Sequence, residues 1–261
     1  MTTIPFFQVD AFAERPLTGN PAAVMPLDRW LDDALLQAIA AENNLSETAF
    51  TVPRELGGAD FELRWFTPTS DVELCGHATI AAGHVLMTGQ SVRFATRAAG
   101  MLYVSRRGDI LELDMPVPPL NEVHEPELNR ALGLPDSPAW LAEGCNDAAI
   151  IELADEAAVR AVKPNFVALR GIHRMAVVTA RGDEHDIVDR VFVPYLGIDE
   201  DPVTGSAHAA LTTYWAKRLG RNEFTALQAS DRTGLLHCRL EGDRVLLGGR
   251  CHTVIEGQFQ L

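Results

Sequence analysis

The segment CGHATIAAGHVLMTG, residues 75–89, decides the fold that we expect, because a counterpart follows it. TGSAHAALTTYWAKRLG, residues 204–220, begins 129 residues further along the chain. Each segment opens with a small or thiol-bearing residue and a glycine, continues with alanine-rich helix-forming sequence, and ends at a glycine. Both are apolar around most of their circumference, which is typical of buried helices. The sequence therefore predicts two similar units, each built around one buried helix.

Strand-like stretches flank the first of these helices. Among them, the prolines and the Gly-Asn pair of residues 15–21 predict a turn, and the apolar spacing of residues 31–42 predicts a helix that Asn43 and Asn44 end. We therefore expect an α+β fold of two pseudo-symmetric lobes, each a curved β-sheet or barrel around a central helix. The expected strands of the first lobe cover residues 6–12, 22–27, 47–52, 61–66, 91–96, 101–106 and 110–116.

Residues 115–126 contain four prolines and predict a linker between the lobes. We expect an N-terminal lobe over residues 1–115 and a C-terminal lobe over residues 116–251. Residues 252–261 alternate like a strand, which can pair with either lobe and can complete the N-terminal one.

Composition excludes several classes of partner. The chain has 22 Lys and Arg against 36 Asp and Glu, a net charge of −14, and no long basic run. We expect no nucleic-acid and no membrane partner, since phosphate backbones and anionic bilayers would be repelled. No apolar run approaches the roughly 18 residues of a membrane helix, and the N-terminus does not resemble a signal peptide. The four cysteines, which form no CxxC pair, predict neither a metal site nor a disulfide framework but a cytoplasmic protein; they are Cys75, Cys145, Cys238 and Cys251.

The starts of the two buried helices are candidate anion sites. Backbone N–H groups at a helix N-terminus, together with the helix dipole, favour a bound carboxylate, and Gly76 and Gly205 would let it approach the backbone. His77 and Ser206 would be polar contacts to it. The alternative is structural: the glycines permit tight turns, and the two polar residues stabilise the helix starts.

Cys75 and Glu47 are the candidate acid–base residues. A thiol at a helix N-terminus is expected to ionise more easily than a free one, although a buried cysteine can also be an inert small hydrophobe. Glu47, in NLSETAF (residues 44–50), stands where a helix gives way to an apolar strand and completes no capping box. A partly desolvated carboxylate suits a general base, and the alternative is a solvated edge position.

Four motifs together resemble a known family. Their order and spacing closely resemble the phenazine-biosynthesis PhzF-like isomerase/epimerase family, which has the diaminopimelate epimerase-like fold. The resemblance covers essentially the whole chain, down to the closing Glu256-Gly257. The motifs are GNP at 19–21, NLSET at 44–48, LCGHAT at 74–79 and DPVTGS at 201–206.

The resemblance implies both a fold and an activity. It implies two pseudo-symmetric lobes with the active site between them, a homodimer, and no metal or cofactor. By resemblance, Glu47 moves a proton on the substrate. The residues that bind and orient the substrate by the same resemblance are Gly76, His77, Asp201, Gly205 and Ser206.

The sequence is compatible with three functions. The first is a cofactor-independent isomerase that moves a proton on a small carboxylate, with Glu47 as general acid/base and with His77 and Asp201 stabilising the developing charge. The second is an epimerase or racemase that uses Glu47 and Cys75. Racemases of this fold place a cysteine before each central helix, whereas here the second position is Thr204, which does not titrate near neutral pH. The third is a non-catalytic protein that binds a small carboxylate.

Overall fold

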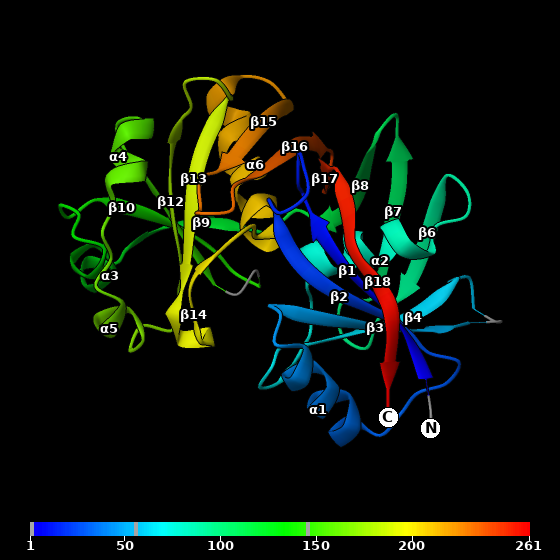
Figure 1. Ribbon diagram of the computed structural model, residues 1–261. Helices are drawn as coiled ribbons and strands as arrows, with labels where there is room; N and C mark the ends of the chain where they lie inside the picture. The colour runs from blue at the N-terminus through cyan, green and yellow to red at the C-terminus, as the bar shows by residue number, and fades with distance from the viewer. Residues whose placement is uncertain (1–2, 55–56, 145–146) are drawn as a thin grey trace. The chain divides into compact units, whose positions relative to one another are not determined.

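The computed structural model describes residues 3–54, 57–144 and 147–261 (Figure 1). Cys145, one of the four cysteines considered above, lies outside these residues. The chain divides into two compact units, each of which is described by itself. Unit 1 comprises Met1–Asp114 and Gly248–Leu261, and unit 2 comprises Met115–Leu247. No helix among the described residues is long and apolar enough to cross a membrane.

The described residues of unit 1 form one sheet and two helices. Its helices are α1 (Asp33–Asn43) and α2 (Gly76–Leu86). Asn44, in the left-handed region at φ 49°, ends α1 where the sequence predicts. The strands are β1 (Thr3–Ala11), β2 (Asn20–Pro26), β3 (Glu47–Pro53), β4 (Phe61–Phe66), β5 (Asp71–Val72), β6 (Ser91–Ala95), β7 (Met101–Arg107), β8 (Ile110–Pro116) and β18 (Cys251–Gln260).

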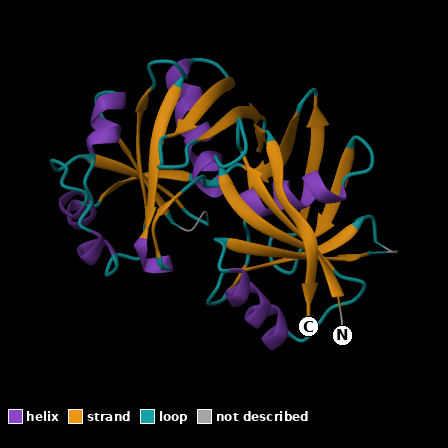
Figure 2. Ribbon diagram, viewed as in Figure 1, coloured by secondary structure: helices purple, strands orange, loops and turns teal. Residues whose placement is uncertain are grey.

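The sheet of unit 1 runs in the order β18, β1, β2, β3, β4, β6, β7, β8. The helix α2 packs against β1, β2 and β3 as well as against β6, β7 and β18, so the sheet curves around it. In Figure 2 this helix lies among the strands of its own unit. The central-helix arrangement expected from residues 75–89 is therefore present.

Unit 2 contains a second sheet and the longer helix α6 (Gly205–Leu219). Three short helices accompany it: α3 (Pro126–Ala131), α4 (Glu156–Ala161) and α5 (Phe166–Leu169), followed by the 3₁₀ turn η1 (Pro194–Leu196). The strands are β9 (Leu120–His124), β10 (Pro138–Ala142), β11 (Ala148–Glu152), β12 (Met175–Arg181), β13 (Ile187–Val193), β14 (Ile198–Asp201), β15 (Glu223–Gln228), β16 (Gly234–Glu241) and β17 (Arg244–Gly249).

The two sheets repeat one pairing scheme. In unit 1, β1–β2 is antiparallel, β2–β3 parallel, β3–β4 antiparallel, β4–β6 parallel and β6–β7 antiparallel. In unit 2 the same succession runs through β10–β11, β11–β12, β12–β13, β13–β15 and β15–β16. A short antiparallel strand is added to the fourth strand in both cases, β5 on β4 and β14 on β13. The internal repeat is thus structural as well as sequential.

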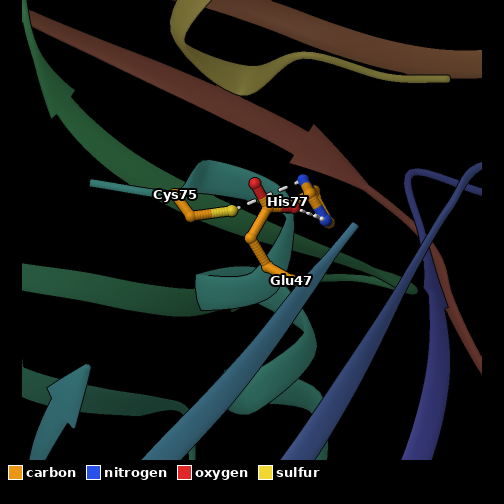
Figure 3. Close-up of side chains that lie close together, drawn as sticks. All are labelled: Glu47, Cys75 and His77. Atoms are coloured by element: carbon orange, nitrogen blue, oxygen red, sulfur yellow. Dashed lines mark hydrogen bonds and ion pairs between the residues drawn. The ribbon is translucent and has the colours of Figure 1, made fainter. Parts of the chain in front are cut away.

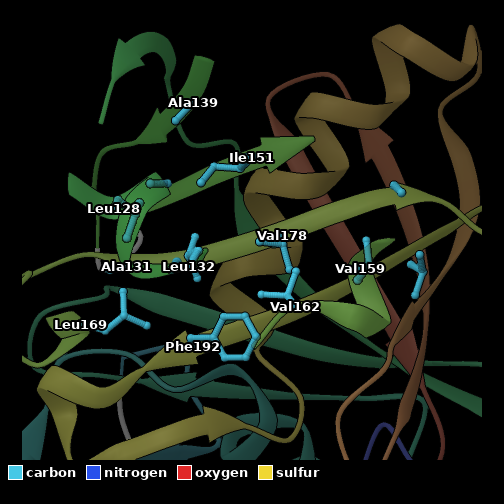
Figure 4. Packing of buried hydrophobic residues seen from close by; sticks show 14 residues of the cluster. Leu128, Ala131, Leu132, Ala139, Ile151, Val159, Val162, Leu169, Val178 and Phe192 are labelled. Carbon is cyan, nitrogen blue, oxygen red and sulfur yellow. The ribbon is translucent and has the colours of Figure 1, made fainter. Parts of the chain in front are cut away.

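Short helices cover further parts of both sheets. In unit 1, Leu36 and Ile39 of α1 pack with Met25, Phe50 and Phe66 of the strands. In unit 2, residues of α3, α4 and α5 form a larger apolar cluster with β10 to β13 (Figure 4). Each sheet is therefore packed against apolar side chains on both of its faces, which explains why many of its strands are buried along most of their length.

The predicted linker over residues 115–126 is wrong in part. Leu120–His124 forms strand β9, which pairs antiparallel with β10, and helix α3 begins at Pro126. Three of the four prolines precede residue 120, so residues 120–124 keep every N–H group that a sheet needs. The four prolines lie at the two ends of residues 115–126, and the strand forms in the proline-free part between them.

Gly83 allows α2 to approach β7 closely, which gives a test of this packing. A Cβ at residue 83 would lie 2.6 Å from Cγ1 and 2.9 Å from Cβ of Val104, which is fully buried. We expect Gly83→Ala to lower the free energy of unfolding by about 1–3 kcal/mol through overpacking, although alanine is the better helix former. Urea denaturation measures this change. Gly89→Ala is the control, because no heavy atom lies within 4 Å of its new Cβ. Equal stability of the two variants would contradict the close approach.

Candidate active site

Three sequence-predicted residues meet at the start of α2 (Figure 3). Cys75 is the N-cap residue of the helix, with extended backbone (φ −140°, ψ 112°), and His77 lies in its first turn. Glu47 is the first residue of β3, a strand that packs against α2. The helix therefore carries the thiol and the imidazole, and the strand supplies the carboxylate.

His77 stands between the other two side chains. Its Nε2 lies 3.1 Å from Oε2 of Glu47, and its Nδ1 lies 3.5 Å from Sγ of Cys75. His77 and Cys75 are buried, whereas the Glu47 side chain is 16% exposed. The Glu47–His77 contact is an ion-pair contact rather than a straight hydrogen bond, because the geometry at both atoms falls outside hydrogen-bond limits. The order thiol, imidazole, carboxylate forms a chain of groups that can pass a proton.

The thiol of Cys75 is held in its neutral form. Burial, and next the nearby carboxylate of Glu47, raise the pKa of Cys75 above its ordinary value. The expectation that this thiol ionises more easily than a free one is therefore wrong. The N-terminus of a helix favours a thiolate, but here the loss of water around the sulfur and the neighbouring negative charge outweigh it.

For His77, the neighbouring groups favour the charged form more strongly than burial opposes it. Burial opposes a charge on the imidazole, but Cys75 and Glu47 outweigh it and hold the pKa of His77 well above its ordinary value. Because Cys75 is a neutral thiol, the counter-charge that matters is the carboxylate of Glu47. His77 can thus carry its proton and its positive charge inside the protein, next to Glu47.

Asn20 is a site residue to which the sequence reasoning gave no role. Its Nδ2 lies 3.3 Å from Nδ1 of His77, and its Oδ1 accepts a hydrogen bond from the Ser46 hydroxyl at 3.2 Å. Rotating the Asn20 amide by half a turn would place its oxygen, an acceptor, next to Nδ1 of His77 instead of its NH2 group, a donor. The Ser46 hydroxyl can pair with either end of the amide, because it both donates and accepts. Asn20 therefore suits both charge states of His77. The signal was present in the quoted motif Gly19-Asn20-Pro21.

The three residues also form the one group of potential metal ligands found among the described residues. Their donor atoms lie within 4.8 Å of one another. Zinc accepts sulfur, imidazole and carboxylate ligands. Here, however, the sulfur faces Nδ1 and the carboxylate faces Nε2, so the ring stands between the other two donors. Since a ring nitrogen binds a metal along its own lone pair, this placement suits a proton relay better than a shared ion.

The start of α6 holds the predicted residues of unit 2. Thr204 is its N-cap residue, again extended (φ −115°, ψ 101°), and neither helix has a hydrogen bond from its N-cap side chain to the first turn. The Thr204 hydroxyl donates to Oδ2 of Asp201 at 2.5 Å, and Gln228 bonds the N–H of Thr204 and the carbonyl of Asp201. Gly205 is buried and Ser206 is half-buried. The turn that precedes α6 is therefore fixed by side chains around it.

Strand register identifies the unit 2 counterpart of Glu47. Thr48 pairs with Phe66 in unit 1, and Ala176 pairs with Phe192 in unit 2. The residue before Thr48 is Glu47, so its counterpart is Met175. When the starts of α2 and α6 are aligned, Cys75 corresponds to Thr204 and His77 corresponds to Ser206. The ionisable side chains at these three positions all belong to unit 1.

Unit 2 has its own buried charged pair, which the sequence reasoning missed. Nε2 of His208 lies 3.1 Å from Oδ1 of Asp189, and neither side chain is exposed. His208 Nδ1 lies 2.8 Å from the carbonyl of Thr204, so both ring nitrogens face acceptors. Burial opposes the charge, but Asp189 outweighs it and raises the pKa of His208. An acid within the apolar strand IVDRVFV was the available signal.

Comparisons with known proteins agree with the geometry. The family model for phenazine biosynthesis-like proteins matches residues 9–257. An uncharacterized isomerase of Pseudomonas aeruginosa is 49% identical over 265 residues, which cover 99% of each chain. The crystal structure of a PhzF family phenazine biosynthesis protein from Enterococcus faecalis matches with a TM-score of 0.89 at 41% identity over 100% of each chain. The chain belongs to the phenazine biosynthesis-like (PhzF-like) family.

Membership of the PhzF-like family confirms three expectations from the sequence: the resemblance itself, the α+β fold class and an enzyme of the isomerase or epimerase class. A more distant structure, a hydroxyproline epimerase from Agrobacterium vitis, matches with a TM-score of 0.64 at 13% identity, covering 98% of this chain and 92% of the epimerase. At that identity the likeness concerns the fold alone.

The His208–Asp189 pair predicts a pH dependence of stability. Because the pKa of His208 is raised on folding, its contribution is complete below the ordinary histidine pKa of about 6.5 and is lost as the pH rises through the folded value. We expect His208→Gln to cost about 3–5 kcal/mol at pH 6, since it leaves Asp189 buried without a cation, and to cost less at alkaline pH.

Urea denaturation of both proteins across this pH range measures the difference. His77 is present in both, so its own titration cancels from the comparison. His173→Gln, an exposed histidine of the same unit, is the control. A cost for His208→Gln that stays constant with pH would show that the pair is not charged.

Proposed function

We propose that this protein is a cofactor-independent isomerase that moves a proton on a small carboxylate substrate, with Glu47 as general acid/base. The observation that carries the proposal is the pairing of Glu47 with His77 at 3.1 Å, at a position whose counterpart is Met175. One acid–base group, without a titrating counterpart, suits a reaction in which the same group removes a proton and returns it at another carbon.

His77 would place a positive charge beside Glu47 during this transfer. The raised pKa of His77 favours an imidazolium, which would stabilise negative charge on Glu47 and on the substrate next to it. When Glu47 carries the substrate proton, Asn20 would keep a hydrogen bond to Nδ1 of His77, because its amide can present either its donor or its acceptor to the ring. The Oε2 atom of Glu47 is buried against His77, which leaves the other oxygen for the substrate.

The helix starts would bind the substrate. We propose that the backbone at Gly76 and at Gly205 holds carboxylate or developing negative charge, as helix N-termini do. His77 and Asp201 would contact the polar group that changes during the reaction, and Ser206 would fix orientation. Cys75 and Thr204 would line the site. The uncapped, extended N-cap residues of α2 and α6 support these roles.

The expected assembly and location are also proposals. We propose a homodimer in the cytoplasm that needs no cofactor or metal and that has no nucleic-acid or membrane partner. The free thiols of the described cysteines, Cys75, Cys238 and Cys251, support a reducing compartment.

Glu47→Gln tests the proposed general acid/base. A panel of small carboxylates incubated with the enzyme in D2O identifies the substrate by loss of a C–H signal in its proton NMR spectrum. Glutamine keeps the size of the side chain but cannot accept the proton, so we expect the exchange rate to fall by about 10²- to 10⁴-fold. Glu42→Gln, at an exposed position of α1, is the matched control. Unchanged exchange in the Glu47 variant, with its fold intact, would contradict the assignment.

The second candidate function is an epimerase that uses Glu47 on one face of the substrate and Cys75 on the other. The observation that favours it is the 3.5 Å contact between Sγ of Cys75 and Nδ1 of His77, through which the thiol could lose its proton. The raised pKa of Cys75 speaks against it, because a neutral thiol is a poor base.

Cys75→Ser separates the two candidates. A serine hydroxyl does not titrate near neutral pH, so an epimerase would lose turnover in at least one direction by about 100-fold or more. For the isomerase we expect turnover within about threefold of the unaltered enzyme, since the group that moves the proton is retained. Rates in both directions, measured by NMR or polarimetry, decide between the two results.

A further inference from the structure

Each unit has one buried histidine that directs its Nε2 atom at a carboxylate. In unit 1, Nε2 of His77 lies 3.1 Å from Oε2 of Glu47. In unit 2, Nε2 of His208 lies 3.1 Å from Oδ1 of Asp189. In both cases burial opposes a charge on the ring, neighbouring groups outweigh burial, and the pKa of the histidine is raised. The two histidines differ in the partner of the second ring nitrogen, Nδ1.

His208 has an acceptor at Nδ1 as well. This nitrogen lies 2.8 Å from the carbonyl oxygen of Thr204, an atom that accepts hydrogen bonds and cannot donate one. Removal of the Nδ1 proton would leave two acceptors facing each other inside the protein, which is costly. The surroundings of His208 therefore suit the imidazolium alone.

The side chain at Nδ1 of His77 is a neutral amide instead. Asn20, the fully buried first residue of β2, places its Nδ2 atom 3.3 Å from this nitrogen. An amide donates through its NH2 group and accepts through its oxygen. It can therefore donate to an unprotonated Nδ1 and, after half a turn, accept from a protonated one. The surroundings of His77 thus suit both charge states of the ring.

Ser46 holds this amide in place. Its hydroxyl donates to Oδ1 of Asn20 at 3.2 Å, and a hydroxyl can equally accept from the NH2 group. The next residue in the chain is Glu47, the partner of Nε2. The dipeptide Ser46-Glu47 therefore holds the imidazole of His77 from both sides, through Asn20 and through its own carboxylate. A change of charge on the ring requires rotation of the amide but no movement of the ring.

Cys75 is the other neighbour of Nδ1, at 3.5 Å. Because its thiol is neutral and a weak donor, it presents no charged acceptor to the ring. Cys75 and Glu47 are the ionisable neighbours that shift the pKa of His77 most. The other charged or titratable side chains on the strands packed against α2 are the same in all variants compared below. They are Asp10, Arg93, Tyr103, Arg106, Arg107, Cys251, His252 and Glu256.

We propose that Asn20 is a positioning residue for His77, whose buried imidazole its amide allows to lose and regain the proton on Nδ1. The proton goes to solvent as the pH rises, and the amide turns to donate to the nitrogen left bare. A group that only accepts, placed where Asn20 is, would keep His77 charged to higher pH, because both nitrogens would then face acceptors, as in His208. This inference concerns the ring and does not rest on the function proposed for Glu47; only the catalytic readout described last rests on it.

Asn20→Asp tests the proposal, because aspartate has the size of asparagine and only accepts. Nitrogen-15 NMR of the full chain with labelled histidine follows the protonation of each ring with pH, and the signal missing in His77→Gln is that of His77. A carboxylate beside Nδ1 favours the charged ring, so we expect the titration midpoint of His77 to rise by about 1–3 pH units.

Asn20→Val is the opposite variant. Valine is close in size and suits a strand, but it offers no acceptor to a protonated Nδ1. We expect the midpoint of His77 to fall by about one pH unit, since burial then opposes the charge with one partner fewer. A merely structural role of Asn20 would not move the midpoint in opposite directions in the two variants. Asn44→Asp, which adds the same charge at an exposed position, is the control and is expected to move the midpoint by less than about 0.5 pH unit.

Each variant is measured alone and in combination with Glu47→Gln. Loss of the Glu47 carboxylate removes one of the charges that raise the pKa of His77, which brings the midpoint closer to the ordinary value of about 6.5 and into the measurable range. An unchanged midpoint in Asn20→Asp and in Asn20→Val, a shift of the same sign in both, or an equal rise in Asn44→Asp would overturn the proposal. If one variant of Asn20 fails to fold, the sign of the shift in the other still decides.

The catalytic readout rests on the proposed function. With a substrate identified by exchange in D2O, we expect the exchange rate to fall at alkaline pH as His77 loses its charge. Asn20→Asp is expected to move this fall to higher pH, together with the NMR midpoint. Midpoints that shift as expected while the pH profile of exchange stays the same would support the role of Asn20 and contradict the role proposed for His77 in the reaction.

Discussion

In each unit, one helix that is apolar around most of its circumference must be kept from water, and the sheet curves to cover it. The helix α2 contacts strands from both halves of the sheet order of unit 1, from β18 and β1 to β6 and β7. Such close packing requires small residues, as Gly83 facing Val104 illustrates. Burial of the whole helix also buries its N-terminus, where N–H groups need partners. A helix start enclosed in this way is a place where a polar side chain or a ligand is needed, and the site residues of unit 1 are found there.

The repeat explains how one backbone can carry different chemistry. The strand pairings and the extended N-cap residues of α2 and α6 correspond, yet side chains at equivalent positions differ. Glu47 corresponds to Met175 and Cys75 to Thr204, so the groups that we propose for proton transfer lie in one unit. Conversely, the His208–Asp189 pair of unit 2 is fully buried and bonds the carbonyl of its own N-cap residue. At the same position of α2, the Thr79 hydroxyl bonds the carbonyl of Cys75. The carbonyl of the N-cap residue is therefore bonded by the imidazole of a charged pair in unit 2 and by a hydroxyl in unit 1.

The sequence was most informative where a side chain had one possible environment. The apolar helices and the alternating strands required burial, and their locations were predicted correctly. Glu47, Cys75 and His77 were singled out because polar groups at the start of buried elements need partners. The sequence was less informative where several environments compete. The ionisation of Cys75 depends on the balance of burial, helix dipole and a carboxylate brought in from β3, and that balance exists only in the folded chain. The roles of Asn20 and Asp189 likewise depend on contacts between distant segments.

The net charge of −14 raises the question of how such a protein would attract the small carboxylate that we propose as its substrate. Many of its arginines are already neutralised by acids in ion pairs, among them Arg93, Arg160, Arg190, Arg218 and Arg250. Long-range attraction is therefore weak, and screening by salt reduces it further. Binding must depend on donors that act at short range and lose little by being buried. Backbone N–H groups at a helix start are such donors, because their positions are fixed before the ligand arrives. An acidic surface is compatible with binding of small anions for this reason, and it adds selectivity, because larger polyanions are repelled before they reach the protein.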